Sequence, residues 1–187
     1  MRHMENKSAI IVIDMLNDFI HGALKLDRAK RIIPNIRKLI ERARKNGVPI
    51  IYTSDAHVPG IDKELELWGQ HALDGTEGAQ VINELKPREG DYTIKKRRYS
   101  AFFATDLDVL LRELEVVSLV LVGIHTHICV LHTAVDAFYR GYAITVPEDC
   151  VEAATEEDHK RAVDQMKSLY GAKIVRSSEL FQEGHRG

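Results

Sequence analysis

The sequence has few features that would crosslink the chain or direct it to a membrane or a nucleic acid. Two cysteines in 187 residues exclude a disulfide framework and favour a reducing, cytoplasmic compartment. No stretch approaches the ~18 consecutive apolar residues of a transmembrane helix, and no signal peptide is evident. A net charge of −2 gives no indication of a nucleic-acid or membrane partner. Neither a P-loop nor a glycine-rich dinucleotide fingerprint occurs, so no motif supports nucleotide binding.

The composition is that of an ordinary globular protein, with 44% hydrophobic and 29% charged residues. The length suffices for one sizeable core, and no linker, repeat or low-complexity segment divides it. We therefore expect a single domain over residues 1–187. Residues 1–4 are interpreted as an expression scar ahead of a natural start at Met4.

Short apolar runs alternate with helical patterns along the chain. Strands are predicted at 9–13, 48–53, 92–95, 116–122, 142–146 and 172–175. Helices are predicted at 28–46 (with Pro34 as an alternative start), 105–114, 129–140 and 155–170. The runs are continuously apolar, as in strands covered on both faces. We expect an α/β fold, a doubly wound, mostly parallel six-stranded sheet with helices on both faces, Rossmann-like in architecture.

Three chemically capable side chains fall at predicted strand ends. Asp14 follows the first run, Lys96 follows the third, and Cys129 lies six residues after Gly123, which closes the fourth. In an open parallel sheet the ligand site lies at the carboxyl ends of the strands, so we expect the three groups to converge. Each residue alone has a simpler interpretation. Asp14 could cap a helix, Lys96 could be solvated, and Cys129 could be a small buried hydrophobic residue. Their joint placement favours catalysis.

The roles of these groups follow from their chemistry. A helix start near Cys129 favours the thiolate, which would attack a carbonyl carbon and form a thioester. Asp14 would take the thiol proton and later give it to the leaving amine. Lys96 would stabilise the negative charges of the Asp14 carboxylate and the Cys129 thiolate. Backbone N–H groups near His125 and Cys129 could stabilise the oxyanion.

A second group of polar residues lies in the irregular stretch 54–91, which is long enough to suggest a functional loop. Asp55, His57 and His71 offer one carboxylate and two imidazoles, a donor set that suits Zn²⁺ with coordination positions left open. The alternative is a loop cap and two solvated histidines. Trp68, three residues before His71, is either an aromatic wall for a flat ligand or an anchor of the loop.

Three motifs in order resemble those of the isochorismatase-like cysteine hydrolases over nearly the whole chain. They are Ile13-Asp14-Met15-Leu16-Asn17-Asp18-Phe19, Lys96-Arg97-Arg98-Tyr99-Ser100-Ala101-Phe102 and Gly123-Ile124-His125-Thr126-His127-Ile128-Cys129-Val130. The resemblance implies that Asp14, Lys96 and Cys129 form a catalytic triad. It also implies a cis peptide bond between Ile124 and His125, ahead of the nucleophile.

Within this group the chain is similar to the nicotinamidases and the N-carbamoylsarcosine amidases. The nicotinamidase resemblance implies that Asp55, His57 and His71 bind a divalent metal, and that Trp68 and Phe19 are walls around a pyridine ring. His125, where the family has a small residue, and the loop 72–78 depart from that pattern. True isochorismatases lack the cysteine, so Cys129 argues against vinyl-ether hydrolysis.

Three functional hypotheses remain open at this point. The first is hydrolysis of a small amide, with nicotinamide as the leading substrate and nicotinate and ammonia as products. The second keeps the triad for a carbamoyl-amide such as N-carbamoylsarcosine or ureidoacrylate. The third is a non-catalytic metal- or partner-binding member of the fold, against which the intact triad argues. We expect a homo-oligomer that acts on a small molecule.

Overall fold

The computed structural model describes residues 7–182, and its centre is one sheet in which every strand pairing is parallel. The strands are β1 (Ser8–Ile13), β2 (Ile50–Asp55), β3 (Tyr92–Lys96), β4 (Ser118–Ile124), β5 (Ala143–Pro147), β6 (Val151–Glu152) and β7 (Lys173–Val175). Their order is β3-β2-β1-β4-β5-β7, with β6 paired to β4. The predicted sheet is confirmed, with β6 as an added strand too short to stand out as an apolar run. The interpretation of residues 1–4 lies outside the described residues.

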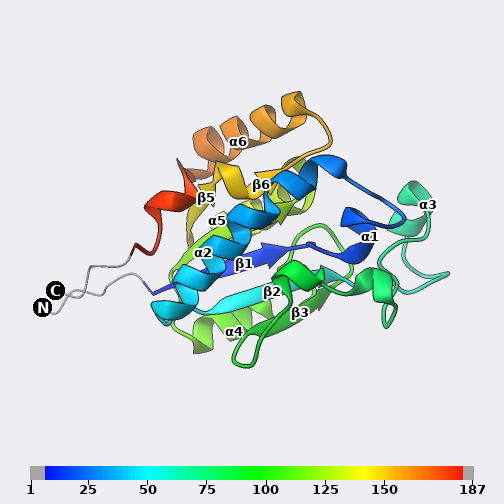
Figure 1. Ribbon diagram of the computed structural model, residues 1–187, viewed down its shortest axis with the longest axis horizontal. Coiled ribbons are helices and arrows are strands. Elements are labelled where there is room, and N and C mark those ends of the chain that lie inside the picture. The colour runs from blue at the N-terminus through cyan, green and yellow to red at the C-terminus, as the bar shows by residue number, and fades with distance from the viewer. Residues whose placement is uncertain (1–6, 183–187) are drawn as a thin grey trace, which may run out of the picture.

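Helices cover both faces of this sheet (Figure 1). They are α1 (Asn17–Ile20), α2 (Ile33–Lys45), α3 (Glu64–Trp68), α4 (Leu107–Glu113), α5 (Leu131–Tyr139) and α6 (Glu156–Tyr170). Successive residues of a strand point to opposite faces. Accordingly Ile10 and Val12 of β1 share a core with α2, whereas Ile11 and Ile13 share the other core with α4, α5 and α6. No helix within residues 7–182 is long and apolar enough to cross a membrane.

The strand order puts a crevice at one end of the sheet. From β1 the chain builds outward through β2 and β3 on one side, and through β4, β5 and β7 on the other. The strand order therefore reverses direction between β1 and β4. Ligands of open α/β sheets bind at such a point, outside the carboxyl ends of the strands. β1 points toward the end of the molecule where α1 and α3 lie (Figure 1), and Phe19 of α1 and Trp68 of α3 line a cavity there.

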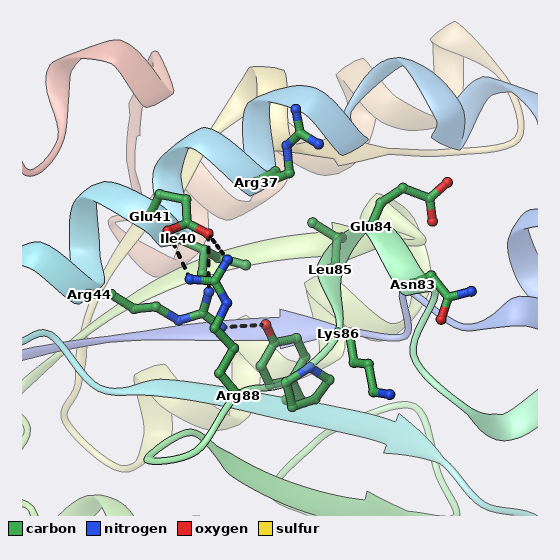
Figure 2. Close-up of a pocket in the computed structure, with 11 residues that line it drawn as sticks. Arg37, Ile40, Glu41, Arg44, Asn83, Glu84, Leu85, Lys86 and Arg88 are labelled. Carbon is green, nitrogen blue, oxygen red and sulfur yellow. Dashed lines mark hydrogen bonds and ion pairs between the residues drawn. The ribbon is translucent and has the colours of Figure 1, made fainter.

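The long stretch after β2 is ordered by contacts at both of its ends. It contains α3 and two 3-10 turns, Glu77–Ala79 and Asn83–Leu85. Figure 2 shows the second half of this stretch against α2, where Arg44 and Arg88 converge on Glu41. These side chains line a hollow of about 240 Å³. Asp91 also accepts hydrogen bonds from the Arg44 guanidinium and, at 2.8 Å, from the Arg88 backbone N–H. This network fixes the segment between β2 and β3 to the helical layer.

Candidate active site

The Lys96 ammonium group lies at the centre of a buried charged cluster. Its Nζ is 2.8 Å from Asp14 Oδ2, 2.6 Å from Asp55 Oδ1 and 3.6 Å from Cys129 Sγ. All four side chains are buried. The structure thus brings together the three predicted groups with Asp55, which the sequence also placed at a strand end, there as a candidate metal ligand.

Strand register explains why these residues meet. Asp55 and Lys96 are the last residues of β2 and β3 and are directly paired. Asp14 follows β1 with φ at 53°, and its backbone N–H donates to the Thr53 carbonyl at 3.0 Å. Cys129 lies in a π-helical turn, Thr126–Val130, between β4 and α5. The predicted helix 129–140 therefore begins only at Leu131, and this wider turn carries the thiol.

Burial governs the protonation states of the thiol and the acid. It raises the pKa of Cys129 well above the ordinary value, although the nearby Lys96 charge opposes that effect. Burial therefore favours the neutral thiol, from which Asp14 is expected to take the proton. Burial, aided by the charge of Asp55, also raises the pKa of Asp14 to about 6. An acid with a pKa in this range can both accept and return a proton near neutral pH.

The two remaining members of the cluster stay charged. Burial alone lowers the pKa of Lys96, but the carboxylates of Asp14 and Asp55 outweigh it and hold that pKa well above its usual range. Burial raises the pKa of Asp55, but the Lys96 ammonium outweighs this effect and the net shift is downward. The cluster therefore has a fixed positive charge between an ionised carboxylate and a titratable one.

The turn that carries the thiol is tightly fitted to the end of β1. The Ile124–His125 peptide bond is cis, and Gly123 before it has φ at 114°. A Cβ at Gly123 would lie 2.0 Å from the Ile13 carbonyl oxygen, so only glycine fits there. Burial lowers the pKa of His125 to about 4, so its imidazole is neutral. The His125 ring meets the Phe19 ring edge-on, with centroids 6.3 Å apart.

Asp55, His57 and His71 form a compact set of metal-binding groups. One ligand atom from each lies within 4.8 Å of the others, and all three residues are buried, so the histidines are not solvated. His71 Nδ1 lies 2.8 Å from the Gly69 carbonyl oxygen, which leaves Nε2 as its free donor atom. Both ring nitrogens of His57 are buried without a hydrogen-bond partner. Because buried polar atoms are normally paired, this nitrogen and oxygen donor set fits Zn²⁺.

A small cavity opens between the thiol and the metal-binding groups. Its volume is about 120 Å³, and Cys129, His71 and Asp55 line it together with Phe19 and Trp68. Both predicted aromatic walls therefore border the cavity. Trp68 is 46% exposed at its rim, and its Nε1–H donates to the Tyr99 hydroxyl at 3.1 Å.

Glu64, Tyr99 and Asp18 are among the residues of the site that were not predicted from the sequence. Glu64 lines the cavity, and its Oε2 lies 3.9 Å from His57 Nε2. The sequence does contain a signal for Glu64. It lies four residues before Trp68, so in a helix the two side chains share one face. Tyr99 reaches the rim from the segment after β3. Asp18 accepts a hydrogen bond from the Ala72 N–H at 2.8 Å and so fixes the backbone beside His71.

A family model described as the isochorismatase domain matches residues 8–179. The chain belongs to the isochorismatase family. It is similar to N-carbamoylsarcosine amidase from Thermoplasma acidophilum, with 43% identity, a TM-score of 0.88 and coverage of 95% of this chain and 99% of that one. It is also similar to nicotinamidase PncA from Bacillus subtilis, at 35% identity and a TM-score of 0.85 over 91% and 99% of the two chains.

A third similar structure bears on the metal-binding groups. Pyrazinamidase of Pyrococcus horikoshii, solved in complex with zinc, is 33% identical, with a TM-score of 0.84 and coverage of 91% of this chain and 99% of that one. This family of hydrolases therefore includes a zinc-containing member with the same fold.

Proposed function

We propose that this protein is an amidohydrolase that cleaves a small amide through a thioester on Cys129, with nicotinamide as the leading substrate. The observation that carries the proposal is the contact of one buried ammonium group, that of Lys96, with Asp14, Asp55 and Cys129. Asp55 and Cys129 of this cluster line the cavity. An isolated buried lysine would be costly. Two carboxylates and a thiol around it form an arrangement suited to nucleophilic catalysis.

In the first half of the proposed reaction, the neutral Cys129 thiol transfers its proton to Asp14 as the sulfur attacks the amide carbonyl carbon. The thiol and both carboxylates of the cluster lie within 4.8 Å of one another, close enough for this transfer. Backbone N–H groups of the turn after the Ile124–His125 bond are suited to the developing oxyanion. Asp14 then protonates the leaving nitrogen, the C–N bond breaks, and ammonia and a thioester result.

In the second half, Asp14 takes a proton from the water that attacks the thioester. The C–S bond breaks, the proton returns to the sulfur, and the carboxylate product leaves. Lys96 remains charged throughout and favours the anionic forms of Asp14 and Cys129. Asp55, His57 and His71 would hold Zn²⁺, whose Lewis acidity would serve to bind a substrate nitrogen or water.

A carbamoyl-amide is the second candidate substrate. It is supported by the 43% identity to an N-carbamoylsarcosine amidase and by the loop 72–78, which departs from the nicotinamidase pattern. Both candidates are small molecules, as a cavity of about 120 Å³ favours. The same triad would act on either, so the cavity walls and not the nucleophile would select the substrate.

Ammonia release from a substrate panel tests the proposal. The purified protein is assayed with nicotinamide, N-carbamoylsarcosine and ureidoacrylate, and Cys129→Ala is the matched inactive variant. We expect activity on at least one of these, and mass-spectrometric detection of an acyl group on Cys129 after acid quenching. Substrate binding without any turnover or acyl adduct would instead support a non-catalytic member of the fold.

A further inference from the structure

We propose that Asp62 is a positioning residue that holds His57 in the orientation and tautomer needed to bind a metal ion. The inference rests on the metal site of the proposed function and extends it to a carboxylate outside that site. Asp62 is absent from the cavity lining, and the proposed reaction assigns it no role.

The His57 ring lies between the carboxylate of Asp62 and that of Asp55. On one side, its Nδ1 is 3.4 Å from Asp62 Oδ2. On the other side, its Nε2 is 3.6 Å from Asp55 Oδ2 and faces the candidate metal ligands. Nδ1 has no hydrogen-bond partner in this structure, but a proton on Nδ1 would face the Asp62 carboxylate at 3.4 Å. It would leave the lone pair of the neutral ring on Nε2, toward those ligands. A carboxylate behind a metal-binding histidine acts in this way in many metal sites.

Asp62 is itself firmly held. Arg97 Nε lies 2.9 Å from its Oδ1 and 3.0 Å from its Oδ2, and Arg97 Nη2 also donates to Oδ1. The Val58 backbone N–H donates to Oδ2 at 2.7 Å, and Arg98 Nη1 lies 3.3 Å from Oδ1. The Asp62 side chain has no exposed surface. A bidentate arginine clamp gives both orientation and charge, so the carboxylate facing His57 is fixed before any ligand arrives.

His71 has a corresponding arrangement. Its Nδ1 lies 2.8 Å from the Gly69 carbonyl oxygen, which directs its other ring nitrogen away from that carbonyl. Both candidate histidine ligands therefore have an oxygen atom near Nδ1, hydrogen-bonded in His71 and at 3.4 Å in His57. A capping role for Asp62 would require only its contact with the Val58 N–H, and would not explain why the carboxylate also faces a buried imidazole.

The test is the zinc affinity of the purified, tag-free protein, measured by competition with a chromophoric chelator. Replacing Asp62 by asparagine (D62N) keeps the shape but offers His57 an amide, and we expect the zinc dissociation constant to rise about 10- to 100-fold. The absorption spectrum of the cobalt-substituted protein should change as well. Arg97→Gln, at a partly exposed side chain, keeps the carboxylate but loosens it, and should weaken zinc binding by a smaller factor.

Asp91→Asn is the matched control, because Asp91 is also clamped by an arginine but lies at the far end of the same segment. It should leave zinc affinity and the cobalt spectrum unchanged, while thermal unfolding of the apo forms shows whether each variant folds. Should Asp62→Asn fold poorly, Arg97→Gln carries the test alone.

Wild-type zinc affinity and an unchanged cobalt spectrum in Asp62→Asn, or in Arg97→Gln if only that variant folds, would overturn the inference. A wild type that binds no zinc would also overturn it. A protein that shows the expected affinities but hydrolyses no amide would contradict the proposed function and support the role of Asp62. The two proposals therefore fail by different measurements.

Discussion

The Asp14 carboxylate accepts a hydrogen bond from the backbone N–H of Asp55, with the two atoms 2.9 Å apart. This bond joins the proposed acid–base group to the strand end that carries a candidate metal ligand. Lys96 contacts both carboxylates, so the nucleophile and the metal-binding groups share one charged cluster. A change at the nucleophile or its acid–base group is therefore expected to alter the metal-binding groups, and the reverse.

Replacement of the nucleophile should abolish hydrolysis. We expect Cys129→Ala to lower kcat by at least about 10³-fold, because a nucleophile and its base act as a unit. Cys150→Ala is the control, since Cys150 is a free, buried cysteine in the core on the other face of the sheet. Steady-state ammonia release measures both. Turnover in Cys129→Ala close to that of the wild type would exclude the thioester mechanism.

The pH dependence should report Asp14. Since its pKa is raised to about 6 and the base form must accept the thiol proton, kcat/KM should fall as pH drops through this range. Asp14→Asn should cost about 10²–10⁴-fold and remove this acid limb. The measurement is a pH–rate profile of both proteins in constant-ionic-strength buffers. A mutant within tenfold of wild type would reduce Asp14 to a hydrogen-bond acceptor.

Loss of the buried ammonium group should make the thiol harder to ionise. The Lys96 charge lowers the pKa of Cys129 against the effect of burial, so in Lys96→Met the alkylation rate should rise only at higher pH. The variant should also lose about 3–5 kcal/mol of stability, because two buried carboxylates lose the ammonium group that compensates their charge. Iodoacetamide kinetics against pH and urea unfolding test these points. An unchanged thiol titration would contradict the electrostatic role of Lys96.

Removal of the metal ion should lower the hydrolytic activity reversibly. We expect about one equivalent of zinc in protein purified without a histidine tag, and loss of that metal in the His57→Ala/His71→Ala double variant. Chelation should lower activity, and added Zn²⁺ should restore it. Elemental analysis and activity before and after dialysis against a chelator are the measurements. If the wild type had no metal and chelation left its activity unchanged, the carbamoyl-amide hypothesis would be preferred.

Gly123 should tolerate no side chain. A Cβ there would lie 2.0 Å from the Ile13 carbonyl oxygen, at a φ of 114°, so Gly123→Ala should cost about 3 kcal/mol or more through backbone displacement and strain. Gly141→Ala is the control, because its Cβ would meet nothing within 4 Å and only its φ of 81° is unfavourable. It should lose about 1–2 kcal/mol. Equal losses in urea unfolding would show that the contact with Ile13 is unimportant.

The pattern of the sequence was sufficient to predict the sheet, its helical layers and the end at which Asp14, Lys96 and Cys129 meet. Continuous apolar runs report strands buried on both faces, and parallel strands deliver their following residues to one edge. β6 escaped this reasoning because a two-residue strand has no periodicity of its own. It exists because the chain after β5 returns to pair with the end of β4.

What the tertiary structure alone decided is the environment of these groups. The local position of Cys129 at a helix start favours the thiolate, whereas burial raises the pKa of the thiol and opposes its ionisation. The contacts of Asp62 with His57 and Arg97 likewise depend on how the segment 56–91 folds back over the strand ends. Residue type and spacing determine which chemistry is available. Desolvation and long-range contacts determine protonation and orientation, and they arise only when the chain is packed.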